Sequence, residues 1–313
     1  MNGEVIAVVR PASPAVSGFT AELFERWVGY IDASPRTVET YNKAVRQFLS
    51  YLKDNGITQP TREDVISFKE YMASTHKPTT AQGYLMAVKQ FFKWTHQEGL
   101  YPNVADNVKA VKLDKGHKKD YLTSGQVKGL LSTSKGDSLN EKRDYAVLAL
   151  MVTSGLRTIE VARANVEDMR TVADFTALYI QGKGHTEKTD YVKLTQPVED
   201  AIRAYLKARG KTSGAEPLFS SISNRDKGQR MTTRSISRIV KGHLLEAGLD
   251  SDRLTAHSLR HTTATLNLLN GGSIEETQQL LRHTSINTTL IYSHALERAK
   301  NNSEQRISNA IFG

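Results

Sequence analysis

The sequence predicts a mainly α-helical protein with a small β-hairpin or sheet, divided into an all-helical N-terminal domain and a larger α+β domain. The length of 313 residues is enough for two domains that each have a core. Apolar residues recur at helical spacing along most of the chain, and strand-like composition is limited to two short segments. A lysine-rich interval interrupts the helical pattern and separates the two parts.

The N-terminal part consists of a tail and a helical domain. Residues 1–17 contain two prolines and little periodicity, so they are expected to form a flexible tail. Residues 18–108 are expected to form the helical domain, and its first helix follows apolar residues from Phe19 to Ile31. The start and stop signals of the other helices are Ser34–Pro35 and Asn55–Gly56 for the second, Thr61 with Asp64 for the third, and Thr79 or Thr80 with Gly99 for the fourth.

The larger domain is expected to cover residues 121–298. Strand composition at 176–180 and 190–194, on either side of Gly182–His185, indicates a β-hairpin with a tight turn. Residues 299–313 remain as a C-terminal tail. Helical patterns in this domain cover about 124–131, 141–152, 158–164, 198–207, 233–246, 258–269 and 274–281.

The basic residues indicate a polyanionic partner. Lys and Arg number 42 against 33 Asp and Glu, which gives a formal net charge of +9. Charge alone leaves a basic enzyme without such a partner about equally plausible. Residues 109–120 are expected to form a basic linker, whose lysines would be solvated in an ordinary connector or would meet phosphates in a DNA-binding one. The lysines concerned are Lys112, Lys115, Lys118 and Lys119.

Several classes of chemistry are excluded by composition. The chain has no cysteine, so disulfides, thiolate catalysis and cysteine metal sites are ruled out. The apolar run from Val5 to Val9 is too short to span a membrane and lacks the flanks of a signal peptide. No phosphate-binding glycine loop of the P-loop type is present. We therefore expect a cytoplasmic protein that uses neither a metal nor an organic cofactor and has no membrane partner.

The segment from Ala256 to His261 is the richest in groups that bind and polarise a phosphate. His257 and Arg260 are three residues apart, so they share one face if the segment is helical. His283 follows an apolar helical pattern, and Tyr292 ends a short helical run nine positions later. Upstream, Arg157 lies at a helix break with a carboxylate, Glu160, three residues on.

These motifs, in this order and spacing, resemble the active site of the tyrosine recombinases, the phage-integrase and Xer-type family. The matching pieces are G-L-R-x-x-E at Gly155 to Glu160, H-x-L-R-H at His257 to His261, and T-x-x-x-Y at Thr288 to Tyr292. The resemblance covers the chain from about Phe19 to the C-terminus. It implies a two-domain C-shaped clamp on double-stranded DNA, with residues 18–108 as the core-DNA-binding domain and residues 121–298 as the catalytic domain.

The resemblance assigns a role to each site residue. Tyr292 would be the nucleophile, Arg157 and Arg260 the phosphate clamp, His257 the base-like partner, and His283 a donor to a non-bridging oxygen. Glu160 would orient Arg157 or His257, although the plain alternative is that Arg157 only pairs with this local acid. Lys183 is the candidate general acid for the leaving 5′ oxygen, with Lys188 as its rival in the same hairpin. His261, directly after Arg260, is expected to point elsewhere on the helix and to serve packing or orientation.

One position departs from the family pattern. The family often has glycine directly before the second histidine, whereas this chain has Arg282. Glycine would ease the end of the helix, while arginine adds a cation that could contact the DNA backbone.

The implied function is site-specific DNA recombination through a 3′-phosphotyrosyl intermediate and a Holliday junction. It would be carried out by a homotetramer on two DNA sites, with the C-terminal segment packed on a neighbouring subunit or folded back on its own domain. An accessory directionality factor is a further candidate partner, and the nucleoid is the expected location. The alternatives are a type IB topoisomerase and a non-catalytic DNA-binding regulator. Because about seventeen residues precede the helical domain, no arm-type DNA-binding domain is expected, which favours simple core sites and leaves integrase and resolvase roles open.

Overall fold

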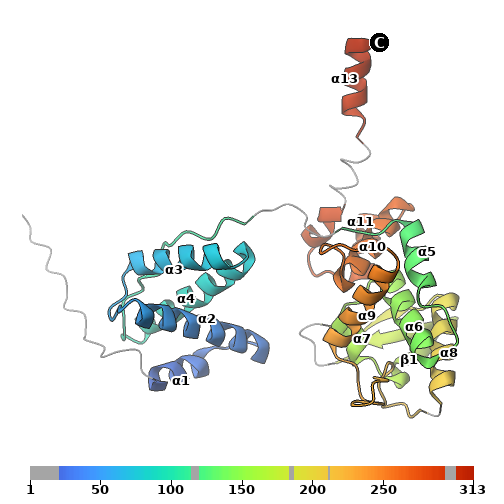
Figure 1. The fold of residues 1–313 in the computed structure, drawn as a ribbon, viewed down its shortest axis with the longest axis horizontal. Helices are drawn as coiled ribbons and strands as arrows, with labels where there is room; N and C mark the ends of the chain where they lie inside the picture. The colour runs from blue at the N-terminus through green and yellow to red at the C-terminus, as the bar shows by residue number, and fades with distance from the viewer. Residues whose placement is uncertain (1–20, 114–119, 183–186, 211, 293–300) are drawn as a thin grey trace, which may run out of the picture. The chain divides into compact units, whose positions relative to one another are not determined.

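The computed structural model describes residues 21–113, 120–182, 187–210, 212–292 and 301–313. The chain forms two compact units, Met1–Lys115 and Gly116–Gly313, and the boundary falls inside the lysine-rich interval 109–120. Figure 1 labels the elements of each unit. No helix within these ranges combines the length and the apolar character needed to cross a lipid bilayer.

The N-terminal unit is helical throughout its regular structure, as predicted. Its α4 contacts each of the other three helices, and aromatic side chains such as Phe48, Phe68 and Phe92 pack edge to face in the core. Ser34 caps α2, and Thr61 with Asp64 forms the predicted capping box of α3. The helices are α1 (Ala21–Tyr30), α2 (Pro35–Asp54), α3 (Arg62–Thr75) and α4 (Pro78–Gln97).

The predicted start of α4 at Thr79 or Thr80 was one or two residues late. The helix begins at Pro78, with Lys77 as its N-cap residue. Proline suits the first helical position because its fixed φ fits the helix and its missing N–H is not needed there.

The larger unit contains seven predicted helices and a sheet, and it adds elements that the sequence did not reveal. Helices α9 and α11 begin and end where the apolar pattern predicted, and the others differ by a few residues at their ends. The additions are the short 3₁₀ helix η1 (Val166–Asp168) and the strand β1 (Met169–Val172). The predicted helices are α5 (Ser124–Ser132), α6 (Leu139–Ser154), α7 (Thr158–Arg163), α8 (Gln196–Arg209), α9 (Thr233–Glu246), α10 (Ala256–Leu269) and α11 (Ile274–Leu281).

The sheet is antiparallel in the order β1-β2-β3, with β2 (Phe175–Ile180) in the centre and β3 (Asp190–Lys193) at the edge. The last pair of β2 and β3 is Ile180 with Asp190. The connection therefore runs from residue 181 to residue 189, and it includes the segment Gly182–His185 where a tight turn was predicted. Residues 183–186 lie outside the described ranges. Strand β1 was missed because only four residues form it and none of them is buried.

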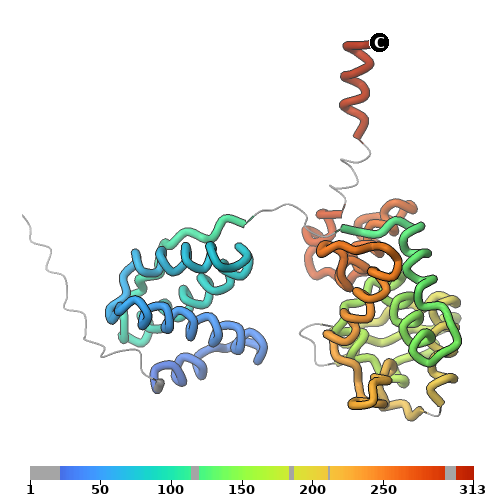
Figure 2. Tube along the Cα trace, viewed as in Figure 1, coloured from blue at the N-terminus to red at the C-terminus, as the bar shows by residue number. Residues whose placement is uncertain are grey.

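Helix α6 is surrounded by other helices of the larger unit, whose chain trace is drawn in Figure 2. It contacts α5, α8, α9 and α10, and a continuous run of its residues from Ala146 to Val152 is buried. A helix that is apolar on all sides is expected to be surrounded by other elements. The residues that follow α6 are therefore held in place by a rigid core.

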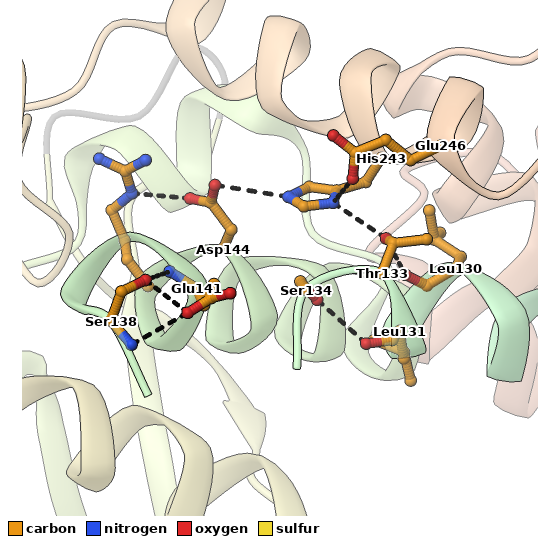
Figure 3. Close-up of polar contacts among 10 residues, drawn as sticks. Leu130, Leu131, Thr133, Ser134, Ser138, Glu141, Asp144, His243 and Glu246 are labelled. Carbon is orange, nitrogen blue, oxygen red and sulfur yellow. Dashed lines mark hydrogen bonds and ion pairs between the residues drawn. The ribbon is translucent and has the colours of Figure 1, made fainter. Parts of the chain in front are cut away.

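A polar cluster joins the end of α5 to α6 and α9 (Figure 3). The imidazole of His243 lies 2.9 Å from the hydroxyl of Thr133, 3.0 Å from a carboxylate oxygen of Glu246 and 3.4 Å from one of Asp144. Asp144 also accepts a hydrogen bond from the Nε of Arg143 at 2.8 Å. These contacts raise the pKa of His243, first through the hydrogen bond to Asp144.

The predicted C-terminal tail contains a helix, α13 (Ser303–Phe312). None of its residues is buried, and the apolar side chains of Ile307, Ile311 and Phe312 are 59%, 65% and 85% exposed. Within the described chain, this helix therefore presents apolar side chains to solvent instead of packing them into its own unit.

Candidate active site

The turn between α6 and α7 brings the first predicted arginine to the site. Gly155 ends α6 in the left-handed conformation, with φ 60°. A Cβ atom at this position would lie 2.6 Å from the Cδ2 atom of Leu281, so the end of α11 packs directly on the turn. Arg157 then caps α7, and this close packing places it beside the segment that carries His283.

Glu160 holds Arg157 in this position. Its Oε2 accepts a hydrogen bond from the Arg157 backbone N–H at 2.7 Å, and its Oε1 accepts one from Nη1 at 2.8 Å. Glu160 is fully buried, whereas the Arg157 side chain is 31% exposed. These contacts fit the expected orienting role of Glu160 as well as the plain pairing of Arg157 with a local acid.

Arg260, on α10, joins two neighbouring segments. Its Nη1 donates to the carbonyl oxygen of Gly155 at 2.5 Å, and its Nη2 donates to the carbonyl oxygen of Leu281. The residue is 2% exposed. Its pKa falls to about 10, because burial and the nearby cations Arg157 and Arg282 disfavour the charged form.

His257 and His261, one helical turn apart on α10, also reach the site. Their rings meet edge to face with centroids 4.8 Å apart, and the ring of His261 lies 5.2 Å from that of Tyr292. The prediction that His261 points elsewhere on the helix was wrong, although a packing or orienting role stays consistent with these contacts. The four-residue spacing from His257 would have placed both histidines on one face.

The end of α11 carries the second predicted histidine. The Nδ1 atom of His283 lies 2.9 Å from the hydroxyl of Thr289, which fixes the ring. Thr289 is fully buried, and the sequence motif did not predict this contact with His283. Burial, with the charges of Arg260, Arg157 and Arg282, lowers the pKa of His283 to about 4. The imidazole is therefore neutral near pH 7.

Tyr292 lies in a helical stretch that includes residues 287–292. It is 6% exposed, and burial raises its pKa, while Arg260 and Arg157 oppose that rise. The two arginines therefore favour the phenolate that a nucleophilic tyrosine must form.

Five of the six predicted catalytic residues line one open cavity of about 550 Å³. Side chains that come from distant parts of the chain converge there, and hydroxyl groups of the loop before Tyr292 complete the wall. The predicted residues are Arg157, His257, Arg260, His283 and Tyr292, and the others are His261, Thr284, Ser285, Thr288 and Ile291. No group of three or more metal-ligating side chains that could hold an ion occurs in the part of the chain that is described.

Two lysines, Lys183 and Lys188, are candidates for the general acid. Lys183 lies outside the described residues. Lys188 is described, and its Nζ lies 2.5 Å from a carboxylate oxygen of Asp168, which is 2% exposed. The ammonium of Lys188 is thus paired with a buried carboxylate, although its own side chain is 23% exposed.

The predicted DNA-binding residues also divide into two groups. Lys112 is exposed, whereas Lys115, Lys118 and Lys119 lie outside the described residues. Arg282, the remaining candidate for a contact with the DNA backbone, is largely covered by the protein. Its side chain is only 12% exposed, and its Nη2 lies 3.1 Å from Glu160 Oε2.

Comparison with known proteins identifies the class. The domain described as the phage integrase family matches residues 120–298, and the N-terminal SAM-like domain of phage integrases matches residues 23–102. The chain is 32% identical over 293 residues to the tyrosine recombinase XerC of Chlamydia muridarum, covering 86% of this chain and 90% of that protein. It is 30% identical over 276 residues to the tyrosine recombinase XerD of Vibrio cholerae, covering 84% and 87%.

Solved structures share the fold. The XerH site-specific recombinase in a post-cleavage complex with palindromic difH substrate superposes with a TM-score of 0.70 at 20% identity, covering 93% of this chain and 84% of that one. A lambda integrase fragment in a dimer bound to a core site gives a TM-score of 0.67 at 16% identity, covering 85% of this chain and 96% of that one.

The chain belongs to the phage integrase family of tyrosine recombinases. Its activity is that of a tyrosine site-specific recombinase, and the alternatives of a topoisomerase and a non-catalytic regulator are set aside.

Proposed function

We propose that Tyr292 is the nucleophile of DNA strand exchange in this protein. The phenolic oxygen attacks the scissile phosphorus, its proton leaves to a neighbouring base, and the bond from phosphorus to the 5′ oxygen breaks. A 3′-phosphotyrosyl link and a free 5′ hydroxyl result. The 5′ hydroxyl of a partner strand then attacks the link and releases Tyr292, so the phosphodiester bond energy is retained.

The convergence of two arginines and two histidines on the cavity of Tyr292 carries this proposal. Guanidinium groups are planar and stay charged, so Arg157 and Arg260 suit the non-bridging oxygens, where negative charge develops. His283 is neutral and fixed by Thr289, so it can donate one hydrogen bond to the phosphate without carrying a charge. His257 lines the same cavity and is the candidate base-like partner for the proton of the phenol.

We infer that Lys183 is the acid that protonates the leaving 5′ oxygen. Its rival Lys188 is paired with a buried carboxylate at Asp168, and leaving that carboxylate alone would be costly. The nine-residue connection between β2 and β3, which contains Lys183, is long enough to reach away from the sheet. The exposed Lys112 and its neighbours in the interval 109–120 are proposed to contact the phosphates of the duplex.

We further propose that four copies act together on two DNA sites in the cytoplasm. Lambda integrase, which shares this fold, has been solved as a tetramer bound to a Holliday junction, at 17% identity and a TM-score of 0.65. The exposed apolar side chains of α13 would pack on a neighbouring copy in such an assembly. An accessory directionality factor is proposed as a further partner, and the recognised DNA sequence decides between integrase and resolvase roles.

A trapped nicked substrate tests the proposal. The wild-type protein is expected to form an adduct that survives a denaturing gel, and peptide mapping is expected to place the DNA on Tyr292. The Tyr292→Phe variant is expected to bind the same DNA without forming the adduct. An adduct on another residue, or none with correctly folded protein on its own site, would overturn the assignment. Sequencing the junctions made in neighbouring genomic DNA would identify the site.

A further inference from the structure

Arg282 occupies a backbone position that favours glycine. It ends α11 with φ 54° and ψ 48°, in the left-handed region that a residue with a Cβ atom adopts at a cost. Helix α11 could end there with glycine and avoid this cost. An arginine at this position therefore calls for an explanation in its side chain.

The side chain of Arg282 points into the protein. Its Nη1 donates to the carbonyl oxygen of Leu280 at 2.7 Å, and its Nη2 donates to Glu160 Oε2 at 3.1 Å. Its Nε is buried and has no hydrogen-bond partner among the described residues. Burying a guanidinium in this incompletely satisfied way is expensive unless its charge is needed.

Glu160 is the group that uses this charge. Its single carboxylate contacts the guanidinium groups of both Arg157 and Arg282, and it is fully buried. With Arg157 alone, the two charges would cancel, and the pair would offer little net attraction to a phosphate. With Arg282 present, the three residues carry a net charge of +1, and Arg260 adds a further cation beside them.

Arg282 and Arg157 also differ in their access to the cavity. Arg157 lines the cavity and is 31% exposed, whereas Arg282 is 12% exposed and is not among the lining residues. The buried arginine can therefore neutralise the carboxylate while the more exposed one faces the substrate.

We propose that Arg282 is a positioning residue that neutralises Glu160, so that Arg157 stays oriented toward the scissile phosphate and its positive charge is not cancelled. This inference rests on the proposed function of the cavity. It replaces the expected role of Arg282 in contacting DNA with a role that acts through Glu160.

The test compares Arg282→Gly with Arg282→Lys and with a matched control. Arg282→Gly removes the cation and relieves the backbone, so the melting temperature is expected to hold or rise. The rate of Tyr292 adduct formation on pre-bound nicked DNA is expected to fall roughly tenfold to hundredfold through misplacement of Arg157. Arg282→Lys is expected to recover part of that loss. Ala173→Gly relieves the same kind of backbone strain, at φ 50°, on an exposed turn, and is expected to leave the rate unchanged.

Two further readouts separate positioning from a general structural effect. In a Glu160→Gln background, Arg282→Gly is expected to have little further effect on the rate of adduct formation, since no carboxylate remains to be neutralised.

The charges facing His283 are Arg157, Arg260, Arg282 and His257. Loss of Arg282 is therefore expected to raise the pKa of His283 and to shift the acid limb of the pH–rate profile to higher pH.

A wild-type adduct on Tyr292 together with an unchanged rate in Arg282→Gly would overturn this inference alone. So would equal effects of Arg282→Gly in the wild-type and Glu160→Gln backgrounds, or a rate loss that is uniform across pH. Failure of the wild-type protein to form the Tyr292 adduct would instead overturn the proposed function itself.

Discussion

The rings of His283 and Tyr292 lie nearly parallel, with an interplanar angle of 9° and centroids 6.5 Å apart. Neither ring is freely placed: His283 is fixed by Thr289, and Tyr292 is 6% exposed in its helical segment. Both side chains also line the same cavity. This pairing links the end of α11 to the nucleophile and makes the site sensitive to anything that shifts either element.

The protonation state of His283 can be measured directly. Its pKa of about 4 in the folded protein lies below the ordinary value of 6.5, so the unfolded chain binds this proton more readily. Acidification from pH 6.5 toward 4 is therefore expected to destabilise the fold through this residue. An NMR titration, with the resonance assigned by His283→Gln, is expected to show a midpoint well below 6. A midpoint near 6.5 would contradict the neutral-donor role.

The general acid can be identified with a substrate whose leaving oxygen is replaced by sulfur. A thiolate leaves without protonation, so loss of the acid costs much less on this substrate. Lys183→Ala is expected to slow cleavage of ordinary DNA by about 10²–10⁴-fold and to be rescued by the sulfur substrate.

Lys188→Ala serves as the matched comparison in that experiment. Because Lys188 pairs with buried Asp168, its loss is expected to lower the melting temperature, and the sulfur substrate is expected to give no specific rescue. Rescue of Lys188→Ala, and not of Lys183→Ala, would reverse the assignment.

Gly155 is expected to tolerate no side chain. In Gly155→Ala, the new methyl group would meet Leu281 Cδ2 at 2.6 Å with φ at 60°. We expect a loss of about 1–3 kcal/mol from overpacking alone, which is roughly 2–4 °C in melting temperature for each kcal/mol. Strand cleavage is expected to fall further, since Arg157 and His283 each lie two residues beyond this contact in the sequence.

The double variant Gly155→Ala/Leu281→Ala checks the contact itself. Its loss of stability is expected to be smaller than the sum of the two single losses, because Leu281→Ala opens the space that the methyl group needs. Additive losses in thermal unfolding would show that the close approach is not what limits this position.

His243 is expected to make the stability of the larger unit depend on pH. Its folded-state pKa is raised above the ordinary 6.5, first by the hydrogen bond to Asp144, so the protonated form stabilises the fold. That stabilisation is fully present below pH 6.5 and is lost as the pH rises through the folded-state value. The difference in unfolding free energy between wild type and His243→Gln is expected to shrink on that rise. A difference that does not change from pH 6 to 9 would argue against stabilisation of the fold by protonated His243.

Local patterns determined much of this protein from the sequence alone. Helices such as α9 and α11 followed from apolar spacing, and the capping box of Thr61 and Asp64 followed from neighbouring residues. These features depend on contacts within one helical turn, and the sequence contains all of them. The motifs at Arg157, His257 and Tyr292 were recognisable because their order and spacing are written in the chain, and the family matches confirmed the class.

Only the tertiary structure decided how the residues of the cavity meet. The burial of Arg282 against Glu160, the contact of His261 with Tyr292 and the ion pair of Lys188 with Asp168 all join distant or differently oriented segments. Periodicity assigns a side chain to a face of its own element, but it does not say which other element covers that face. Here the packing of α11 on the Gly155 turn decides which element covers the site, and it brings Arg282 to Glu160.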